Sequence, residues 1–191
     1  MILIIDNGSQ YTHLIKRNCR DLGFEAQIVD NKSPYLEFEK RITKIQKIII
    51  SGGPSSVYKG ENGLSELVVK MIDAEKIDYP ILGICFGHQL IAHILGGKVE
   101  KGKSAEYGIA KITVDEPDVL FNGVPKEFNV WVSHFDEVKE IPSDFIPLAH
   151  SSTCRYEGMK HKSRDIYGLQ FHPEVWHTEH GEKILENFLR L

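Results

Sequence analysis

The chain has 191 residues, of which 41% are hydrophobic and 26% charged, as in an ordinary globular protein rather than a disordered one. Its 23 basic and 27 acidic residues give a net charge of −4, so no excess of positive charge points to nucleic acid. The longest apolar runs are far below the ~20 residues that a membrane span needs. Met1 leads straight into a strand-like segment without a secretory signal, so we expect a single cytoplasmic domain over residues 1–191 that binds neither nucleic acid nor membrane.

The N-terminal half alternates between strands and helices. Continuous apolar runs predict strands at residues 2–6, 25–29, 47–51 and 80–84. Helical periodicity predicts helices at residues 10–22, 35–44, 64–74 and 86–95, the first of them capped by Ser9. This alternation is typical of a parallel sheet with helices on both faces.

From about Lys98 the pattern changes to short strands joined by turns. These strands are expected at residues 110–114, 128–132, 146–150, 155–160 and 167–171, before a closing helix at 181–191. The predicted fold is therefore α/β, with a mostly parallel central sheet flanked by helices and an antiparallel or mixed C-terminal extension.

The three cysteines, Cys19, Cys85 and Cys154, are too few and too widely spaced for a disulfide framework or a zinc site built on cysteine pairs. Cys85 lies in Gly83-Ile84-Cys85-Phe86-Gly87, between a buried strand and a helix. The flanking glycines permit a sharp turn that presents the thiol at the sheet edge, where the helix N-terminus favours a thiolate. On these residues alone, a buried structural cysteine remains an equally good interpretation.

His172 is the strongest of nine candidate bases, because it follows a buried strand and should lie at the carboxyl edge of the sheet. In extended backbone, the side chain of Glu174 points the same way as that of His172 and can orient its ring. A metal cluster of His172, Glu174, His177 and His180 is a weaker alternative because the H-E-x-x-H spacing is absent, and we expect no metal.

A third segment, Ser51-Gly52-Gly53-Pro54-Ser55, ends another predicted strand at the same edge. Its paired glycines let backbone N–H groups approach a ligand, either as oxyanion donors beside Cys85 or as a phosphate cradle. Pro54 removes one donor and the chain has no G-x-x-x-x-G-K-[ST] motif, so the phosphate alternative is the weaker one.

Taken in chain order, these three segments resemble those of the class I (triad) glutamine amidotransferases. The resemblance covers nearly the whole chain and implies a flavodoxin-like core. Within that family they resemble the amidotransferase part of GMP synthases. The blocks that carry this resemblance are Asp6-Asn7-Gly8-Ser9-Gln10-Tyr11, Ser51-Gly52-Gly53-Pro54-Ser55-Ser56-Val57, Gly83-Ile84-Cys85-Phe86-Gly87-His88-Gln89, Trp131-Val132-Ser133-His134 and Gly168-Leu169-Gln170-Phe171-His172-Pro173-Glu174-Val175.

The resemblance implies that Cys85 attacks the side-chain amide of glutamine while His172, oriented by Glu174, handles the protons. It also implies an oxyanion hole at the backbone N–H groups of Gly53 and Phe86. The residues that it places around glutamine, largely through backbone contacts, are Gln89, Ser133, His134 and Phe135. Phe135 stands where many relatives have glycine.

Full-length GMP synthases also contain an ATP-pyrophosphatase domain, for which this sequence has no counterpart. The resemblance therefore implies an amidotransferase subunit that supplies ammonia to a separate ATP-pyrophosphatase subunit, which aminates XMP to GMP. ATP and magnesium are expected on that partner, and no cofactor is expected in this chain. Two alternatives stay open: a stand-alone cysteine hydrolase of γ-glutamyl peptides, and a regulatory binding module without catalysis.

Overall fold

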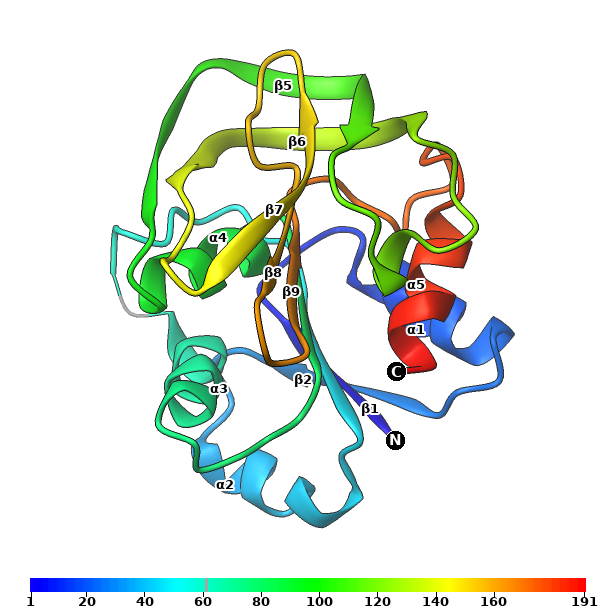
Figure 1. Ribbon diagram of the computed structural model, residues 1–191. Helices are drawn as coiled ribbons and strands as arrows, with labels where there is room; N and C mark the ends of the chain where they lie inside the picture. Colours follow the sequence, from blue (N-terminus) through cyan, green and yellow to red (C-terminus); the bar gives the residue numbers. More distant parts are fainter. Residues whose placement is uncertain (61) are drawn as a thin grey trace.

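The computed structural model describes residues 1–60 and 62–191, and its strands form one nine-stranded sheet (Figure 1). The strands are β1 (Ile2–Asp6), β2 (Ala26–Asp30), β3 (Lys47–Ile50), β4 (Ile81–Ile84), β5 (Lys98–Val114), β6 (Glu127–Glu140), β7 (Phe145–Ser151), β8 (Gly158–His161) and β9 (Ile166–Leu169). The α-helices are α1 (Thr12–Asp21), α2 (Tyr35–Glu39), α3 (Gly63–Asp73), α4 (Phe86–Ile94) and α5 (Gly181–Leu189). No helix in these ranges is long and apolar enough to cross a membrane.

The first half of the sheet is parallel, in the order β2-β1-β3-β4-β9. Both faces of β1 are buried, because Ile2 and Ile4 pack in one core with α1 and α5 while Leu3 and Ile5 pack in a second core with α3 and α4. Figure 1 shows these two groups of helices on opposite sides of the sheet. Burial on both faces explains the continuous apolar runs of the parallel strands, and the predicted fold class is confirmed.

The second half of the sheet is antiparallel and continues through β8, β7 and β5 to β6. The hairpin of β5 and β6 is its largest part, with strands of 17 and 14 residues. Only residues 110–114 and 128–132 of these strands were expected. The segment from Lys98 to Gly108 is rich in charge and glycine, and its extended form depends on pairing with β6, so its own sequence carries little strand signal.

Two local predictions are wrong. The helix expected at residues 35–44 ends at Glu39 and is followed by a separate 3₁₀ turn at Ile42–Lys44, where β-branched residues are poor helix formers. Ser9 does not cap α1, because Tyr11 occupies the N-cap position and the Ser9 hydroxyl instead accepts a bond from the Tyr11 amide at 3.1 Å. The strand expected at residues 2–6 is present with those boundaries, and the other predicted elements are present with shifted boundaries.

The topology brings four connecting segments to one edge of the sheet. Because β1, β3, β4 and β9 are parallel, the residues that follow them meet at the carboxyl ends of the strands. These segments begin at Asn7, Ser51, Cys85 and Gln170. The three candidate segments of the sequence therefore share one location.

Candidate active site

Cys85 occupies a sharp turn between β4 and α4. Its backbone has φ 52° and ψ −102°, a conformation that costs a non-glycine residue about 1–3 kcal/mol. The Cys85 amide donates to the carbonyl of Leu169 at 2.8 Å, which holds the turn against β9. A Cβ on Gly83 would lie 2.4 Å from the Gly87 carbonyl, and one on Gly87 would lie 2.4 Å from that of Ile50. Both glycines are therefore required for this strand–turn–helix packing.

His172 and Glu174 lie in the segment that follows β9, and both side chains are buried. His172 Nδ1 is 2.8 Å from Glu174 Oε1, so one ring nitrogen is committed to the carboxylate and Nε2 remains for other partners. The Cys85 and His172 side chains line the same hollow, and a Cβ on Gly52 would lie near both of them. The Cys85 sulfur lies 3.8 Å from the Ser133 carbonyl oxygen. The structure thus brings Cys85, His172 and Glu174 together in one line of contacts.

The charge of His172 is controlled by these two neighbours. Burial by itself lowers the pKa of His172, because it penalises the charged ring. The negative charge of Glu174 and the neighbouring Cys85 side chain outweigh burial and hold the pKa of His172 well above its ordinary value of 6.5. The ring therefore holds a proton strongly at neutral pH and can retain the proton that the neighbouring thiol loses.

The segment that carries His172 is fixed to the free edge of β6. The His172 amide donates to the Trp131 carbonyl and the Trp131 amide donates to Thr178 Oγ1, both at 2.9 Å. Further along, the Glu179 amide donates to the Asn129 carbonyl at 2.9 Å, and the Asn129 amide donates to Glu179 Oε2 at 2.7 Å. The position of the His172 backbone is thus set by a strand that is distant in sequence.

The glycine pair after β3 passes directly beside the thiol and the imidazole. A Cβ on Gly52 would lie 3.0 Å from His172 Cε1 and 3.6 Å from Cys85 Cβ. A Cβ on Gly53 would lie 2.6 Å from the Asn7 carbonyl oxygen. Phe86 directly follows Cys85 and is the first residue of α4, and the first N–H groups of a helix have no partner within it. Gly53 therefore lies in the loop that lines the space next to Cys85, and Phe86 is the residue after Cys85.

A cavity of about 340 Å³ opens from Cys85 toward β6. Its wall includes all four residues expected around glutamine, namely Gln89, Ser133, His134 and Phe135. The Gln89 amide nitrogen is already bound, at 2.6 Å to the Asp136 carbonyl and at 3.1 Å to Gln170 Oε1. A second hollow of about 330 Å³ lies on the other side of Cys85, against Tyr11 and His172. Cys85 is the thiol shared by both spaces.

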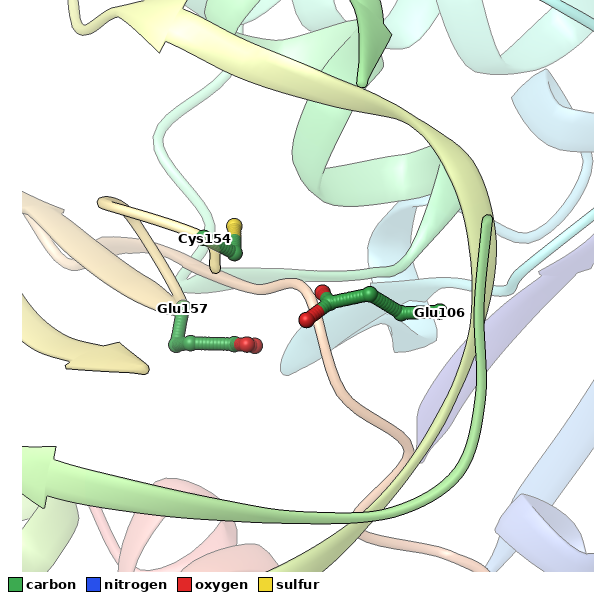
Figure 2. Close-up of side chains that lie close together, drawn as sticks. All are labelled: Glu106, Cys154 and Glu157. Atoms are coloured by element: carbon green, nitrogen blue, oxygen red, sulfur yellow. The ribbon is translucent and has the colours of Figure 1, made fainter. Parts of the chain in front are cut away.

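The imidazole of His134 belongs to a buried acidic group behind this cavity. His134 Nδ1 is 3.1 Å from the Asp136 carbonyl oxygen, and Nε2 is 2.9 Å from Glu106 Oε2. Figure 2 shows the carboxylates of Glu106 and Glu157 pointing toward one another, with Cys154 nearby. Burial raises the pKa of Glu157 to about 7, although the charge of His134 opposes the shift.

Glu106, Cys154 and Glu157 are also the one group of potential metal ligands that residues 1–60 and 62–191 bring together, with ligand atoms within 4.8 Å of one another. The raised pKa of Glu157 favours a proton on its carboxylate, which removes one negative charge from this group. The alternative cluster of His172, Glu174, His177 and His180 does not converge in the same way among the described residues.

Three residues near the site had no assigned role in the sequence. Thr178 donates from its hydroxyl to the His172 carbonyl at 2.6 Å. Tyr11 packs edge-on against the His172 ring, with centroids 5.0 Å apart, and its hydroxyl accepts from Trp131 Nε1 at 3.2 Å. The blocks that carry the family resemblance contain Tyr11 and Trp131, but no local pattern showed that they would meet.

Fold and site together define a glutamine amidotransferase. The family model of class I glutamine amidotransferases matches residues 3–191, and the chain belongs to this family. The resemblance inferred from the sequence blocks is thereby confirmed.

Among curated proteins, the chain is similar to subunits of one kind of glutamine amidotransferase. The chain is 50% identical to a subunit of glutamine-hydrolyzing GMP synthase from Pyrococcus abyssi, over all of this chain and 98% of the relative. It is 47% identical to the correspondingly named protein from Methanocaldococcus jannaschii, over all of this chain and 97% of the relative.

Solved structures agree with this assignment. A Thermoplasma acidophilum protein described as a GMP synthase subunit superposes with a TM-score of 0.87 at 40% identity, covering 99% of this chain and 92% of that one. A glutamine amidotransferase from Thermotoga maritima, at 21% identity, shares the fold with a TM-score of 0.79, covering 99% of this chain and 94% of that one.

Proposed function

We propose that this chain is the glutamine-hydrolysing subunit of a two-subunit GMP synthase. It releases ammonia from L-glutamine and passes it to a separate subunit that aminates XMP to GMP. The observation that carries the proposal is that Cys85 lies beside His172, whose ring contacts Glu174, next to a cavity in a chain of the class I amidotransferase family. Full-length similarity to proteins named as subunits of GMP synthase supports the choice of product.

In the proposed reaction, Cys85 Sγ forms a bond to the side-chain carbonyl carbon of glutamine. Nε2 of His172 takes the thiol proton and then gives it to the departing nitrogen, so the carbon–nitrogen bond breaks and ammonia leaves. Water, deprotonated by His172, cleaves the resulting thioester to glutamate and restores the thiol. Glu174 stabilises the imidazolium that forms in each half of the reaction.

The negative charge that develops on the carbonyl oxygen needs donors close to Cys85. We assign this role to the backbone N–H groups of Gly53 and Phe86, because Gly53 lines both spaces next to the thiol and Phe86 begins α4. A helix N-terminus also carries partial positive charge, which favours the oxyanion.

The cavity toward β6 suits an amino-acid substrate. Lys59 and Lys101 bring positive charge to it, as the α-carboxylate of glutamine requires, and Asp136 brings negative charge for the α-amino group. Ser133 and Phe135 offer backbone groups, whereas the side chain of Gln89 holds the Asp136 backbone in place. We propose that the His134 ring does not contact glutamine but holds the cavity wall in place, through its bonds to the Asp136 carbonyl and to Glu106.

The product sets the requirement for a partner. Ammonia released into water is protonated and loses its nucleophilic lone pair, so an acceptor must lie against the outlet of the site. We propose that the acceptor is an ATP-pyrophosphatase subunit that holds ATP, magnesium and XMP, and that residues 1–191 act as one domain without a cofactor of their own. A reducing cytoplasm suits a thiol nucleophile.

The test is reconstitution with the XMP-aminating subunit of the same organism. Cys85→Ala is expected to abolish glutamine-dependent GMP formation while formation from added ammonia persists. Cys19→Ala is the matched control, since burial raises the pKa of the Cys19 thiol to about 12 and keeps it unreactive. Loss of ammonia-dependent activity in Cys85→Ala, or efficient hydrolysis of γ-glutamyl peptides without the partner, would contradict the proposal.

A further inference from the structure

Large apolar side chains are exposed together on the outer face of the β5–β6 hairpin and on the loop beside it. Trp176 is 83% exposed, Tyr107 75%, Ile109 56% and Phe135 44%. With the partly buried Trp131 they form what we call the aromatic surface. An indole and a phenol left in water at these levels are typical of surfaces that bind another protein.

The strand register explains why these side chains gather. Side chains two residues apart along a strand share a face, so Trp131 and Phe135 of β6 point the same way. Ile109 of β5 pairs with Trp131, and Tyr107 pairs with Ser133, which places both β5 residues on that face. The hairpin lies at the opposite end of the molecule from α2 (Figure 1).

Four rings, those of Tyr107, Trp131, His177 and Trp176, contact one another in series. Trp131 meets Tyr107 edge-on at 5.4 Å between centroids and stacks on His177 at 4.8 Å. Trp176 lies 3.7 Å from His177, again between centroids. Through Tyr11, which bonds to Trp131 and packs against His172, the same series reaches the buried imidazole.

Polar residues border the apolar centre at one end of the hairpin. Beyond Ile109 on β5, Lys111 forms an exposed ion pair with Glu127 of β6, and Asn129 lies exposed beside Trp131. An apolar centre enriched in aromatic residues with a charged margin is the usual composition of a protein–protein interface.

We propose that the aromatic surface is the docking surface for the subunit that receives ammonia. This inference rests on the proposed function. Tyr11 and Ser133 line the hollow at Cys85, and each is next to a member of the aromatic surface, Tyr11 by a hydrogen bond and Ser133 within β6. A protein seated on the surface therefore covers the outlet of the site, and covering that outlet is what unprotonated ammonia requires of its acceptor.

The same contacts connect the aromatic surface to the His172 backbone and ring, so a docked subunit can influence the active site. Trp131, a member of the aromatic surface, also connects to His172, since its carbonyl accepts from the His172 amide and its indole donates to the Tyr11 hydroxyl. Any displacement of Trp131 on docking is transmitted to the imidazole through these bonds. Glutamine hydrolysis is then expected to respond to the partner through this residue.

The experiment measures the affinity of the XMP-aminating subunit for this chain by calorimetry, with wild type, Tyr107→Ala and Trp176→Ala. Each substitution is expected to raise Kd at least ten-fold, while glutaminase activity of the free chain stays within two-fold of wild type. Tyr35 and Leu36 are exposed apolar residues of α2. Tyr35→Ala and Leu36→Ala are therefore the matched controls, and each is expected to leave Kd within two-fold of wild type.

An unchanged Kd in both Tyr107→Ala and Trp176→Ala would overturn the inference while leaving the proposed function intact. Sedimentation of the free chain tests a second copy as the occupant. A dimer that Trp176→Ala converts to monomer would also overturn it. If the wild-type chain transfers no ammonia to the partner at all, the proposed function fails and the inference falls with it.

Discussion

The hydroxyl of Thr178 donates a 2.6 Å hydrogen bond to the carbonyl of His172 and accepts a 2.9 Å bond from the amide of Trp131. One side chain therefore connects the backbone of the proposed base to the edge strand of the sheet. The two bonds fix where the imidazole stands relative to Cys85, although Thr178 touches neither the thiol nor the cavity.

Thr178→Val tests this link. Loss of the hydroxyl leaves the Trp131 amide and the His172 carbonyl without this partner, so we expect unfolding free energy to fall by about 1–3 kcal/mol. Misplacement of His172 is expected to lower kcat roughly ten-fold or more. Denaturant unfolding and glutaminase kinetics measure the two effects, and Thr178→Ser is expected to retain most of both. An inactive Thr178→Ser would show that more than the hydroxyl matters.

Glu174→Gln tests the proposed orienting carboxylate. The amide keeps the shape but removes the charge that raises the pKa of His172, so we expect that pKa to fall toward or below 6.5. The loss in kcat is expected to be roughly 10²–10⁴-fold, with a smaller change in KM. NMR titration of the ring and steady-state kinetics supply the measurements. Glu182→Gln, at an exposed position of α5, is the control.

Gly52→Ala tests how closely the loop after β3 approaches the site. The added methyl would stand 3.0 Å from His172 Cε1 and 3.6 Å from Cys85 Cβ. We expect kcat to fall by about 10²-fold because the imidazole must move, with little change in melting temperature. At Gly60 an added Cβ meets no heavy atom within 4 Å, so Gly60→Ala should behave as wild type. Full activity in Gly52→Ala would contradict the geometry.

Glu157→Gln tests the buried acidic group by pH. The pKa of Glu157 is raised from 4.5 to about 7, so folding favours its protonated form. In the wild type, the protonated Glu157 side chain leaves the free energy of unfolding undiminished below pH 4.5. That free energy falls as pH rises toward 7, because the buried side chain must then ionise. The glutamine variant carries no charge, and its stability relative to wild type is expected to grow over that range and then level off at about 3 kcal/mol. A pH-independent difference between the two would contradict a raised pKa.

Much of the site was predictable because its parts follow local rules. The turn at Cys85 is visible in Gly83 and Gly87, and the place of His172 follows from the end of a parallel strand and the proline after it. The alternation of strands and helices in the first half sufficed for the fold class. In each case the relevant residues are neighbours in the chain.

The remainder depends on contacts between distant residues. The first ten residues of β5 have little strand pattern and are extended because β6 pairs with them. Nothing near Thr178 indicates that it will meet Trp131, 47 residues earlier. His134 was expected around glutamine largely through its backbone, and it does line the cavity. The direction of its ring, toward Glu106, is determined only by the folded hairpin.

The attachment of residues 172–179 to β6 has a consequence for the behaviour of the protein in solution. β6 is an edge strand of the sheet, and an edge strand ordinarily exposes unpaired backbone amides and carbonyls that can pair with another polypeptide chain. At Asn129 and Trp131 those groups are already occupied by the loop. A neighbouring molecule therefore finds no template there for cross-molecule β-addition, and exposed tryptophan and tyrosine can be displayed beside it without seeding aggregates.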